Sequence, residues 1–279
     1  MGRTILEAKN MSVLFGNKKA VNNVNVVFSS GETVLIAGRN GAGKSTFLRT
    51  LGGLIMPDKG SMDYKDITKD KIGIITEKMS LFRSMSLNEG IAFHSKMFGI
   101  NDFDYSILKN LEMDLNIKIS DLSSGQRAVY HLSLLISQRP ELLLIDEVIY
   151  LIDPFLRDVF IDSLIDLLDG SDTAVIMVNH TFSDTGKIPD RVIIMDEGEI
   201  IIDEKREVLL SKVKKISVEN PEKLDLPVFF TKNTPFGYEH FIYPYEEEKM
   251  GNKNFQIDSV GLNEIIKAFL GGRYAKKRD

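Results

Sequence analysis

The chain has 279 residues, of which 43% are hydrophobic and 27% charged, with a net charge of −5 and no cysteine. This length and composition suit a folded protein with one large domain and room for a small one. The acidic balance argues against a general nucleic-acid-binding protein, and the lack of cysteine excludes disulfides and thiolate metal sites.

Neither a secretory signal nor a membrane span is expected from the sequence. Met1–Asn10 carries no apolar core of the signal-peptide type. No apolar run approaches the ~18–20 residues that cross a bilayer as a helix. If the protein serves a membrane process, we therefore expect another chain to span the membrane.

Apolar runs and turn signals predict strands in the first part of the chain. Residues 4–28 have strand character, interrupted by a turn signal at Gly16–Asn17. Thr33–Ala37 is a short apolar run of strand type that follows a further turn. We expect the turn at Pro57–Gly60 to open another pair of short strands.

Strands and helices alternate in the middle of the chain. Apolar residues at helical spacing predict helices between 86 and 138 and from Phe155 to Leu168. Arg191–Met195 and Ile200–Ile202 are expected to form a hairpin. Three unbroken apolar runs predict buried strands: Ile72–Thr76, Leu142–Ile145 and Ala174–Val178. This alternation predicts an α/β domain with a largely parallel sheet.

After the hairpin the character of the sequence changes. Residues 211–258 are richer in lysine, proline, phenylalanine and tyrosine and contain short strand-like pieces. A helix is expected over Leu262–Leu270, with Gly271–Gly272 as its end. We therefore divide the chain into a large domain at 1–210 and a small α+β accessory domain at 211–279.

The strand at Thr33–Ala37 leads directly into a glycine-rich loop that matches G-x-x-x-x-G-K-[ST]. Glycines in such a loop let backbone N–H groups turn inward and cradle phosphate oxygens at the start of a helix. Lys44 would reach the β- and γ-phosphates, and the Ser45 hydroxyl would bind Mg²⁺. The candidate nucleotide-binding residues of this loop are Gly38, Arg39, Asn40, Gly41, Ala42, Gly43, Lys44, Ser45 and Thr46.

Polar residues also follow three other apolar strands. Glu77, Asp146–Glu147 and Asn179–His180 each come directly after a predicted buried strand. Ligands of open α/β sheets bind at the carboxyl ends of the strands. We therefore expect these segments to converge with the phosphate loop on one site.

The acidic pair at Asp146–Glu147 is suited to metal binding and hydrolysis. Asp146 would hold Mg²⁺ opposite Ser45, directly or through water. Glu147 would lie beside the attacking water as general base or orienting group, a role whose loss typically costs ~10²–10⁴-fold in rate. Taken alone, an Asp-Glu pair after an apolar run more often marks the exposed end of a strand. The phosphate loop upstream favours a role in metal binding and hydrolysis instead.

Leu122-Ser-Ser-Gly-Gln126 and Arg127 lie between the phosphate loop and the acidic pair. Alone, this segment would be a loop and a helix cap. In this order of motifs the chain resembles the ATP-binding-cassette (ABC) ATPases, whose members carry Leu-Ser-Gly-Gly-Gln here. The resemblance covers roughly residues 4–210. It implies a P-loop NTPase fold with a mostly parallel core sheet, an antiparallel β subdomain, and a helical subdomain over about 78–138.

The resemblance implies roles for further residues of the same subunit. Phe15 would stack on adenine, with a core aromatic as the alternative interpretation. Glu77 stands where most members have a glutamine that contacts Mg²⁺ and the attacking water. His180 matches the histidine that contacts the γ-phosphate, although a lone histidine is more often structural.

Other residues are implied to act across a dimer. Ser123, Ser124, Gly125 and Gln126 would bind the γ-phosphate of ATP held by a second subunit. Asp153 matches the aspartate that communicates between the two subunits. The sequence departs from the family pattern at Glu77, Ser124, Val148 and Tyr150-Leu-Ile152. These departures are expected to affect the rate of hydrolysis and the geometry of the loop that leads to Asp153. Nucleotide binding is still expected.

The resemblance therefore implies an ATP-binding and ATP-hydrolysing subunit with ATP and Mg²⁺ as cofactors. Its expected partners are a second ATPase subunit and a polytopic membrane permease, which would hold it at the cytoplasmic face of the cell membrane, and no nucleic acid is expected. The tail at Val260–Ile266 resembles more weakly that of ABC-2-type exporter ATPases, so export is expected. The alternatives are a soluble ABC ATPase of translation or DNA repair, and a regulatory cassette with little hydrolysis.

Overall fold

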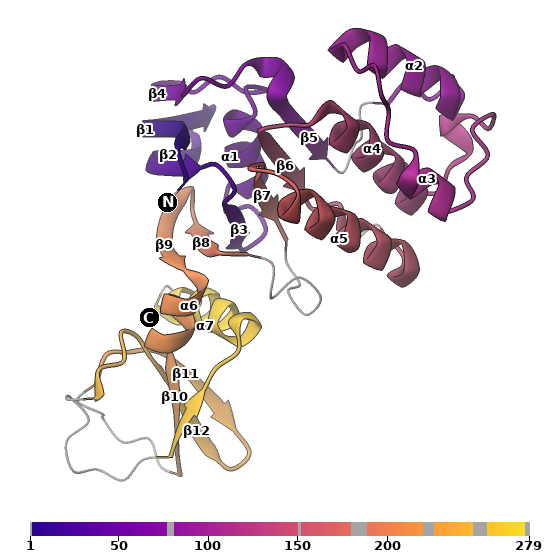
Figure 1. Cartoon of the computed structure of the whole chain (residues 1–279). Helices are drawn as coiled ribbons and strands as arrows, with labels where there is room; N and C mark the ends of the chain where they lie inside the picture. The colour runs from indigo at the N-terminus through magenta and orange to yellow at the C-terminus, as the bar shows by residue number, and fades with distance from the viewer. Residues whose placement is uncertain are drawn as a thin grey trace.

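The computed structural model describes residues 2–76, 81–149, 152–179, 189–219, 226–247 and 256–276. A six-stranded sheet forms its centre, in the order β5-β6-β7-β3-β8-β9 (Figure 1). Its strands are β3 (Thr33–Gly38), β5 (Ile72–Thr76), β6 (Leu142–Asp146), β7 (Ala174–Val178), β8 (Arg191–Asp196) and β9 (Glu199–Lys205). Neighbouring strands run parallel except β8 and β9, which form the predicted hairpin. The predicted α/β architecture is confirmed.

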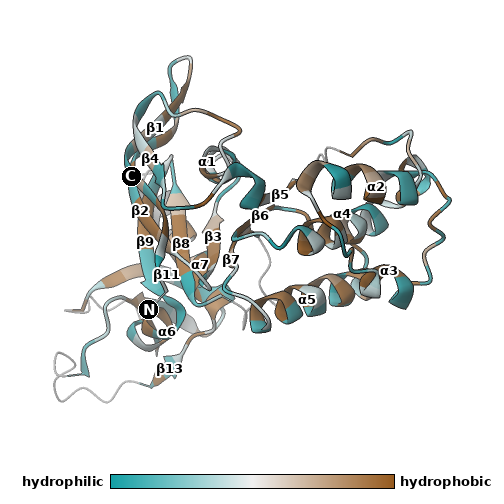
Figure 2. Ribbon diagram, turned by 45° about the horizontal axis from the view of Figure 1, so that its top comes forward, coloured by the Kyte–Doolittle hydropathy of each residue, from teal (hydrophilic) through white to brown (hydrophobic). Residues whose placement is uncertain are grey.

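The central strands are apolar because helices or a second sheet cover both of their faces. Every residue of β3, β6 and β7 is buried, and the hydrophobic colour is plain on the central strands β3 and β8 in Figure 2. Helix α1 (Lys44–Leu51) packs on the side of the second sheet, and α5 (Pro154–Asp169) packs on the other side. Parallel pairing brings the carboxyl ends of β3, β5, β6, β7 and β8 to one edge.

A second sheet of three antiparallel strands has the order β2-β1-β4. Strands β1 (Thr4–Phe15) and β2 (Lys18–Ser29) confirm the strand prediction for residues 4–28 and turn at Gly16–Asn17. The expectation of a pair of strands after Pro57–Gly60 is wrong. One strand, β4 (Lys59–Tyr64), follows that turn, and it pairs with β1, which offers a long free edge.

The predicted helical segment between 86 and 138 contains α2 (Leu87–Phe98), α3 (Ser106–Asn110) and α4 (Ser124–Gln138). These helices share a separate apolar cluster that includes Leu87, Phe103 and Tyr130. Capping boxes begin both α2 and α4, so the two long helices start at fixed points. The Tyr130 hydroxyl donates a hydrogen bond to the Leu87 carbonyl and joins α4 to α2.

The imidazole of His131 on α4 makes the stability of this helical unit sensitive to acid. Its Nδ1 is buried and has no hydrogen-bond partner among the described residues. Burial, with a smaller contribution from His94, lowers the pKa of His131 from 6.5 to about 4. The unfolded chain therefore binds the proton first as the pH falls. The neutral, buried His131 side chain therefore contributes fully to the stability of the folded state above about pH 6.5, and this contribution is lost as the pH falls toward 4.

We expect this effect to lower the free energy of unfolding by on the order of 3 kcal/mol between about pH 7 and pH 4. Urea denaturation at several pH values measures it. The His131→Gln variant, which has no imidazole to protonate, should show a shallower pH dependence than wild type. His240→Gln, in the C-terminal sheet, is the comparison: burial lowers the pKa of His240 as well, so this variant should lose part of the pH dependence and His131→Gln a larger part. Equal pH dependence in wild type and His131→Gln would contradict the assignment.

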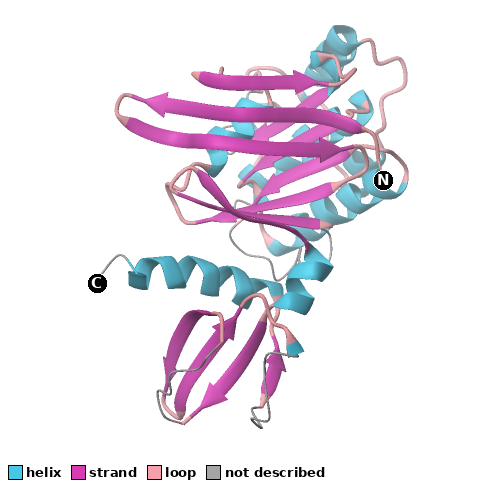
Figure 3. Cartoon of the chain, turned by 90° about the vertical axis from the view of Figure 1, so that its left-hand side faces the viewer, coloured by secondary structure: helices cyan, strands magenta, loops and turns pink. Residues whose placement is uncertain are grey.

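The C-terminal part forms a third sheet in the order β11-β12-β10-β13. Its strands are β10 (Lys214–Val218), β11 (Val228–Thr234), β12 (Gly237–Ile242) and β13 (Ile257–Ser259), and it follows α6 (Arg206–Lys212). Helix α7 (Leu262–Lys276) lies between this sheet and the central sheet (Figure 3). Ile265 and Ile266 of α7 belong to the same buried cluster as Val192 and Ile194 of β8. The division at residue 210 stays a prediction, and the two parts share a core.

The predicted end of the last helix at Gly271–Gly272 is wrong, because α7 continues to Lys276. A glycine inside a helix costs only about 1 kcal/mol relative to alanine, which packing can offset. At Gly271 a Cβ atom would lie 2.8 Å from the Phe230 ring. The missing side chain thus allows α7 to pack closely on β11.

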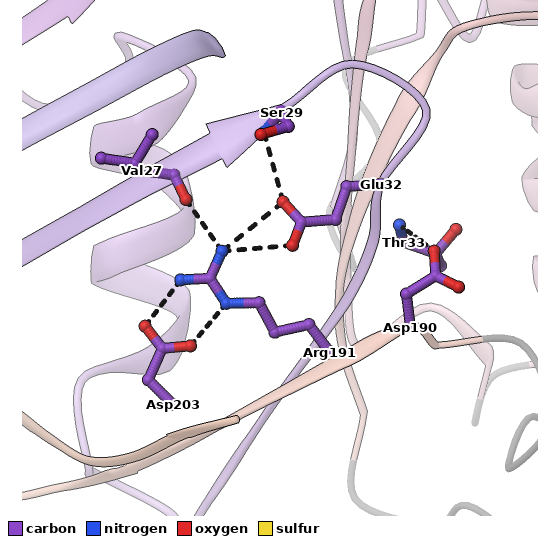
Figure 4. Close-up of polar contacts among 7 residues, drawn as sticks. All are labelled: Val27, Ser29, Glu32, Thr33, Asp190, Arg191 and Asp203. Atoms are coloured by element: carbon purple, nitrogen blue, oxygen red, sulfur yellow. Dashed lines mark hydrogen bonds and ion pairs between the residues drawn. The ribbon is translucent and has the colours of Figure 1, made fainter. Parts of the chain in front are cut away.

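Arg191 joins several segments at the amino edge of the parallel strands (Figure 4). Its guanidinium donates to the Val27 carbonyl at 2.8 Å and pairs with Glu32 at 3.2 Å and with Asp203. Nearby, the Asp190 carboxylate accepts a hydrogen bond from the Thr33 N–H at 3.0 Å. These contacts hold the starts of β3 and β8 together, at the end of the sheet opposite the predicted phosphate loop.

Candidate active site

The phosphate loop connects the carboxyl end of β3 to the start of α1. Gly43 precedes the helix with a φ of +100°, and Gly41 has a φ of +82°. Such backbone angles favour glycine. Gly43 is restricted further, because a Cβ atom there would lie 1.9 Å from the Ala20 carbonyl oxygen. The loop therefore has the conformation for which its glycines are required, and it leads into a helix whose first N–H groups have no partner within the helix itself.

Lys44 lies inside this loop and is only 4% exposed. Its Nζ donates hydrogen bonds to the carbonyl oxygens of Gly38 and Arg39, both at 3.1 Å, and lies 3.7 Å from Oε1 of Glu147. Burial lowers the pKa of the Lys44 ammonium group, while the charges of Glu147 and Asp146 oppose that shift. Lys44 thus connects the phosphate loop with the acidic pair at the end of β6.

The Ser45 hydroxyl donates a hydrogen bond to Oδ1 of Asp146 at 2.8 Å, although the two residues lie 101 positions apart. Asp146 is 2% exposed. Burial raises the pKa of its carboxyl group, and the contacts with Ser45 and Arg49 oppose that rise. The Arg49 guanidinium lies 3.3 Å from Oδ2 of Asp146. The parallel strand order thus brings Asp146 directly to the phosphate loop.

The oxygen pair of Ser45 and Asp146 fits a magnesium ion. Mg²⁺ binds oxygen ligands in octahedral geometry at about 2.0–2.1 Å, which separates adjacent ligands by about 2.9 Å. The 2.8 Å between the Ser45 hydroxyl and the Asp146 carboxylate matches this spacing. Among the described residues no cluster of three or more metal-binding side chains is present.

Glu147 follows Asp146 in a left-handed backbone conformation, with a φ of +51°. Its N–H donates to the carbonyl oxygen of Val178 at the end of β7 at 3.1 Å. Non-glycine residues in this conformation often occur at functional sites, because the surrounding structure must hold them there. The side chain is 32% exposed and borders the Lys44 ammonium group. It can therefore reach both water and the phosphate loop.

The segment Ser123–Gln126 begins α4. The Ser123 hydroxyl accepts a hydrogen bond from the Gln126 N–H, and the Gln126 side chain accepts one from the Ser123 N–H. Helix α4 lies away from α1 in both Figure 1 and Figure 2. Ser123, Ser124, Gly125 and Gln126 thus begin a helix that is separate from the helix of the phosphate loop, and their predicted contact with a second subunit's ATP stays a prediction.

Asp153 caps α5 by accepting a hydrogen bond from the Leu156 N–H at 3.1 Å. Its Oδ2 also borders Gly125, where a Cβ atom would lie 3.3 Å away. The structure thus places Asp153 beside Gly125 at the start of α4. Its role across a dimer remains a prediction.

Phe15 lies at the end of β1 and is 56% exposed. Its ring is therefore open to solvent, so the alternative interpretation of Phe15 as a core aromatic residue is excluded. The preceding residue is held by Asp58, whose carboxylate accepts a hydrogen bond from the Leu14 N–H at 2.7 Å. An exposed aromatic ring on a fixed strand end is suited to stacking on a base, and this role remains a prediction.

The structure brings together Lys44, Ser45, Asp146 and Glu147 among the predicted site residues. Gly38, Arg39, Asn40, Gly41, Ala42, Gly43 and Thr46 lie in the same loop and first helical turn. Glu77 and His180 lie outside the described residues, so their predicted roles remain predictions.

No motif of the sequence indicated Arg49 or Asp58. Arg49 lies four residues after Ser45, hence on the same face of α1, and this spacing was the available signal. Asp58 lies in the turn before β4, and nothing in its local sequence indicates that it holds Leu14.

Comparison with known proteins identifies the family. The family model described as "ABC transporter" matches residues 21–149. The energy-coupling factor transporter ATP-binding protein of Clostridium perfringens is 32% identical over 234 residues, which cover 76% of this chain and 80% of that protein. The chain belongs to the ATP-binding proteins of ABC transporters.

Other relatives of this ABC protein differ in what their names describe. The sulfate/thiosulfate import ATP-binding protein of Pectobacterium atrosepticum is 30% identical, over 70% of this chain and 64% of that protein. The linearmycin resistance ATP-binding protein of Bacillus subtilis is 27% identical, over 71% of this chain and 68% of that protein. The names thus include both import and resistance, so the ABC family is confirmed and its exporter subtype is not.

Solved structures confirm the ABC fold. An ATP-binding subunit of an ABC transporter matches with a TM-score of 0.67 and 20% identity, over 74% of this chain and 92% of that one. A dimeric ATP-binding cassette bound to ADP and phosphate matches with a TM-score of 0.63 and 23% identity, over 72% of this chain and 99% of that one. Within the described part of this ABC protein, no helix has the length and apolar character needed to cross a membrane.

Proposed function

We propose that this chain is an ATPase that binds Mg²⁺ and ATP, dimerises around the nucleotide, and drives transport by a separate membrane-spanning partner. The observation that carries the proposal is the meeting of Ser45, Lys44 and Asp146. The Ser45 hydroxyl lies 2.8 Å from the Asp146 carboxylate, and Lys44 is held next to both by the loop. Family membership supports ATP as the nucleotide.

Within one subunit, the phosphate loop would bind the triphosphate and Lys44 would neutralise its charge. A bound Mg²⁺ ion, held by Ser45 and Asp146 with Glu77 near it, would stabilise the charge on the β- and γ-phosphates. Glu147 would orient and deprotonate the attacking water, for which its partial exposure is suited. His180 would contact the γ-phosphate.

A second subunit would complete each site. Ser123–Gln126 begin α4, a helix that lies away from α1 in Figure 1, and this arrangement suits residues that bind a nucleotide held by another copy. Asp153 borders Gly125 of α4 and caps α5 in the same subunit. A displacement of Asp153 by a neighbouring subunit would therefore reach both α4 and α5. ATP binding would close the pair, and hydrolysis would open it.

The work of this cycle would be delivered to a polytopic permease, through which the protein would bind the cytoplasmic face of the membrane. The contact with the permease would lie near α2, in the segment of residues 77–99, which faces the membrane partner in the resembled family. Exposed apolar side chains of this segment include Phe82, Phe93 and Met97. We propose export as the direction, on the sequence of the C-terminal tail and the resistance function named for one relative.

Purification of the tagged protein from detergent-solubilised membranes, followed by identification of bound proteins, tests this proposal. We expect a polytopic membrane protein to co-purify and to raise the rate of phosphate release from ATP. Co-purification with ribosomes or DNA would instead indicate the soluble alternative. ATP binding without phosphate release, even with the membrane partner present, would indicate a regulatory cassette.

A further inference from the structure

The turn between β8 and β9 contacts the phosphate loop, and no motif of the sequence indicated this contact. Glu197 and Gly198 form the turn, with φ values of +50° and +83°. The Gly198 N–H donates a hydrogen bond to the carbonyl oxygen of Ala42 at 2.9 Å. Ala42 is the residue between the two glycines of the loop that have positive φ. We name Glu197–Gly198 the loop-bracing turn.

The loop-bracing turn is itself held by β2. The Asn22 N–H donates to the Gly198 carbonyl oxygen at 2.9 Å, and the Asn22 side chain donates to Glu199 at 2.7 Å. The carbonyl of Ala20, also on β2, lies against both Gly43 and Gly198. A Cβ atom would be 1.9 Å from its oxygen at Gly43 and 3.0 Å from it at Gly198. Three backbone segments therefore pack directly on one another, without side chains between them.

The bond from Gly198 sets the direction of an N–H group in the phosphate loop. The peptide unit between Ala42 and Gly43 is planar and trans, so its carbonyl and its N–H point in opposite directions. Because the Ala42 carbonyl points toward Gly198, the Gly43 N–H points away from the turn. The N–H groups of such a loop are those that bind phosphate oxygens.

We infer that Gly198 is a positioning residue for nucleotide binding, because its N–H orients the Gly43 amide toward the phosphates. This inference rests on the proposed function, since it assumes that the loop binds a triphosphate. Gly198 touches no nucleotide in this scheme and acts only through Ala42 and Gly43. Alanine at position 198 would meet the carbonyl oxygens of Ala20 at 3.0 Å and of Lys19 at 3.1 Å, so either these strands or the turn must shift by a few tenths of an ångström.

The Gly198→Ala variant tests the inference by titration with a non-hydrolysable ATP analogue. We expect its affinity to fall roughly tenfold, because small misplacements of binding groups have large effects on such sites. Gly31→Ala is the matched control. Gly31 has a φ of +69°, in the turn before the start of β3, and its Cβ would meet only Asp172 at 4.0 Å. Both variants carry the backbone strain of alanine at positive φ, so both should lose stability toward urea, and only Gly198→Ala should lose affinity.

Equal affinity in Gly198→Ala and Gly31→Ala would overturn the inference. If wild type itself does not bind the analogue, the proposed function fails instead, so the two failures are distinguishable. Hydrogen exchange of wild type provides a second test that requires no variant to fold. We expect the analogue to slow exchange at the Gly198 amide together with that of the phosphate loop. Slower exchange in the loop alone would overturn the inference.

Discussion

Glu147→Gln is expected to lower ATP turnover by ~10²–10⁴-fold, because glutamine cannot accept the proton of the attacking water. ATP affinity should be retained. Glutamine keeps the size of the side chain, and the backbone contact of residue 147 with Val178 does not involve the side chain. With binding intact and hydrolysis blocked, the variant should accumulate as an ATP-bound dimer. Phosphate release and light scattering in the presence of ATP measure the two effects.

The matched control for this experiment is Glu141→Gln. Glu141 lies just before β6, at the opposite end of the strand from Glu147, and its side chain is 34% exposed against 32% for Glu147. It pairs with Arg3 at the surface, a contact that typically contributes less than ~1 kcal/mol. Turnover of Glu141→Gln should therefore match wild type. A Glu147→Gln protein that stays monomeric in ATP, while wild type hydrolyses normally, would contradict the role given to Glu147.

Lys44→Ala is expected to weaken ATP binding by about 10²-fold, the effect of losing a charge-assisted contact of ~1.5–3 kcal/mol. Stability should change little. Although the variant loses two hydrogen bonds to Gly38 and Arg39, it also removes a charge that burial disfavours, as the lowered pKa of Lys44 indicates. Titration with ATP and urea denaturation would separate the two quantities.

Lys205→Ala provides the comparison for Lys44. Lys205 is exposed at the end of β9, so the variant removes the same charge without touching the loop. Its ATP affinity should equal that of wild type. Unchanged ATP affinity in Lys44→Ala would refute the role of this residue, and a large loss in both variants would indicate a general effect of net charge.

Local signals in the amino-acid sequence were enough to predict the phosphate loop and the buried parallel strands. Glycine spacing and the flanking apolar patterns placed the phosphate loop between a strand and a helix, because the backbone angles of Gly41 and Gly43 favour glycine. Unbroken apolar runs predicted the buried parallel strands. The rule that parallel strands end at one edge then predicted that Ser45 and Asp146 meet, across 101 residues.

Contacts between segments that are distant in the chain could not be predicted from local sequence and became visible in the folded structure. The bond from Gly198 to Ala42, the pairing of Arg49 with Asp146 and the packing of Gly271 on Phe230 each depend on how distant elements meet. The predicted end of α7 was wrong because the packing of α7 on β11 outweighed the weak helix propensity of glycine. Local propensity differences of about 1 kcal/mol cannot fix such contacts, whereas burial of several side chains can.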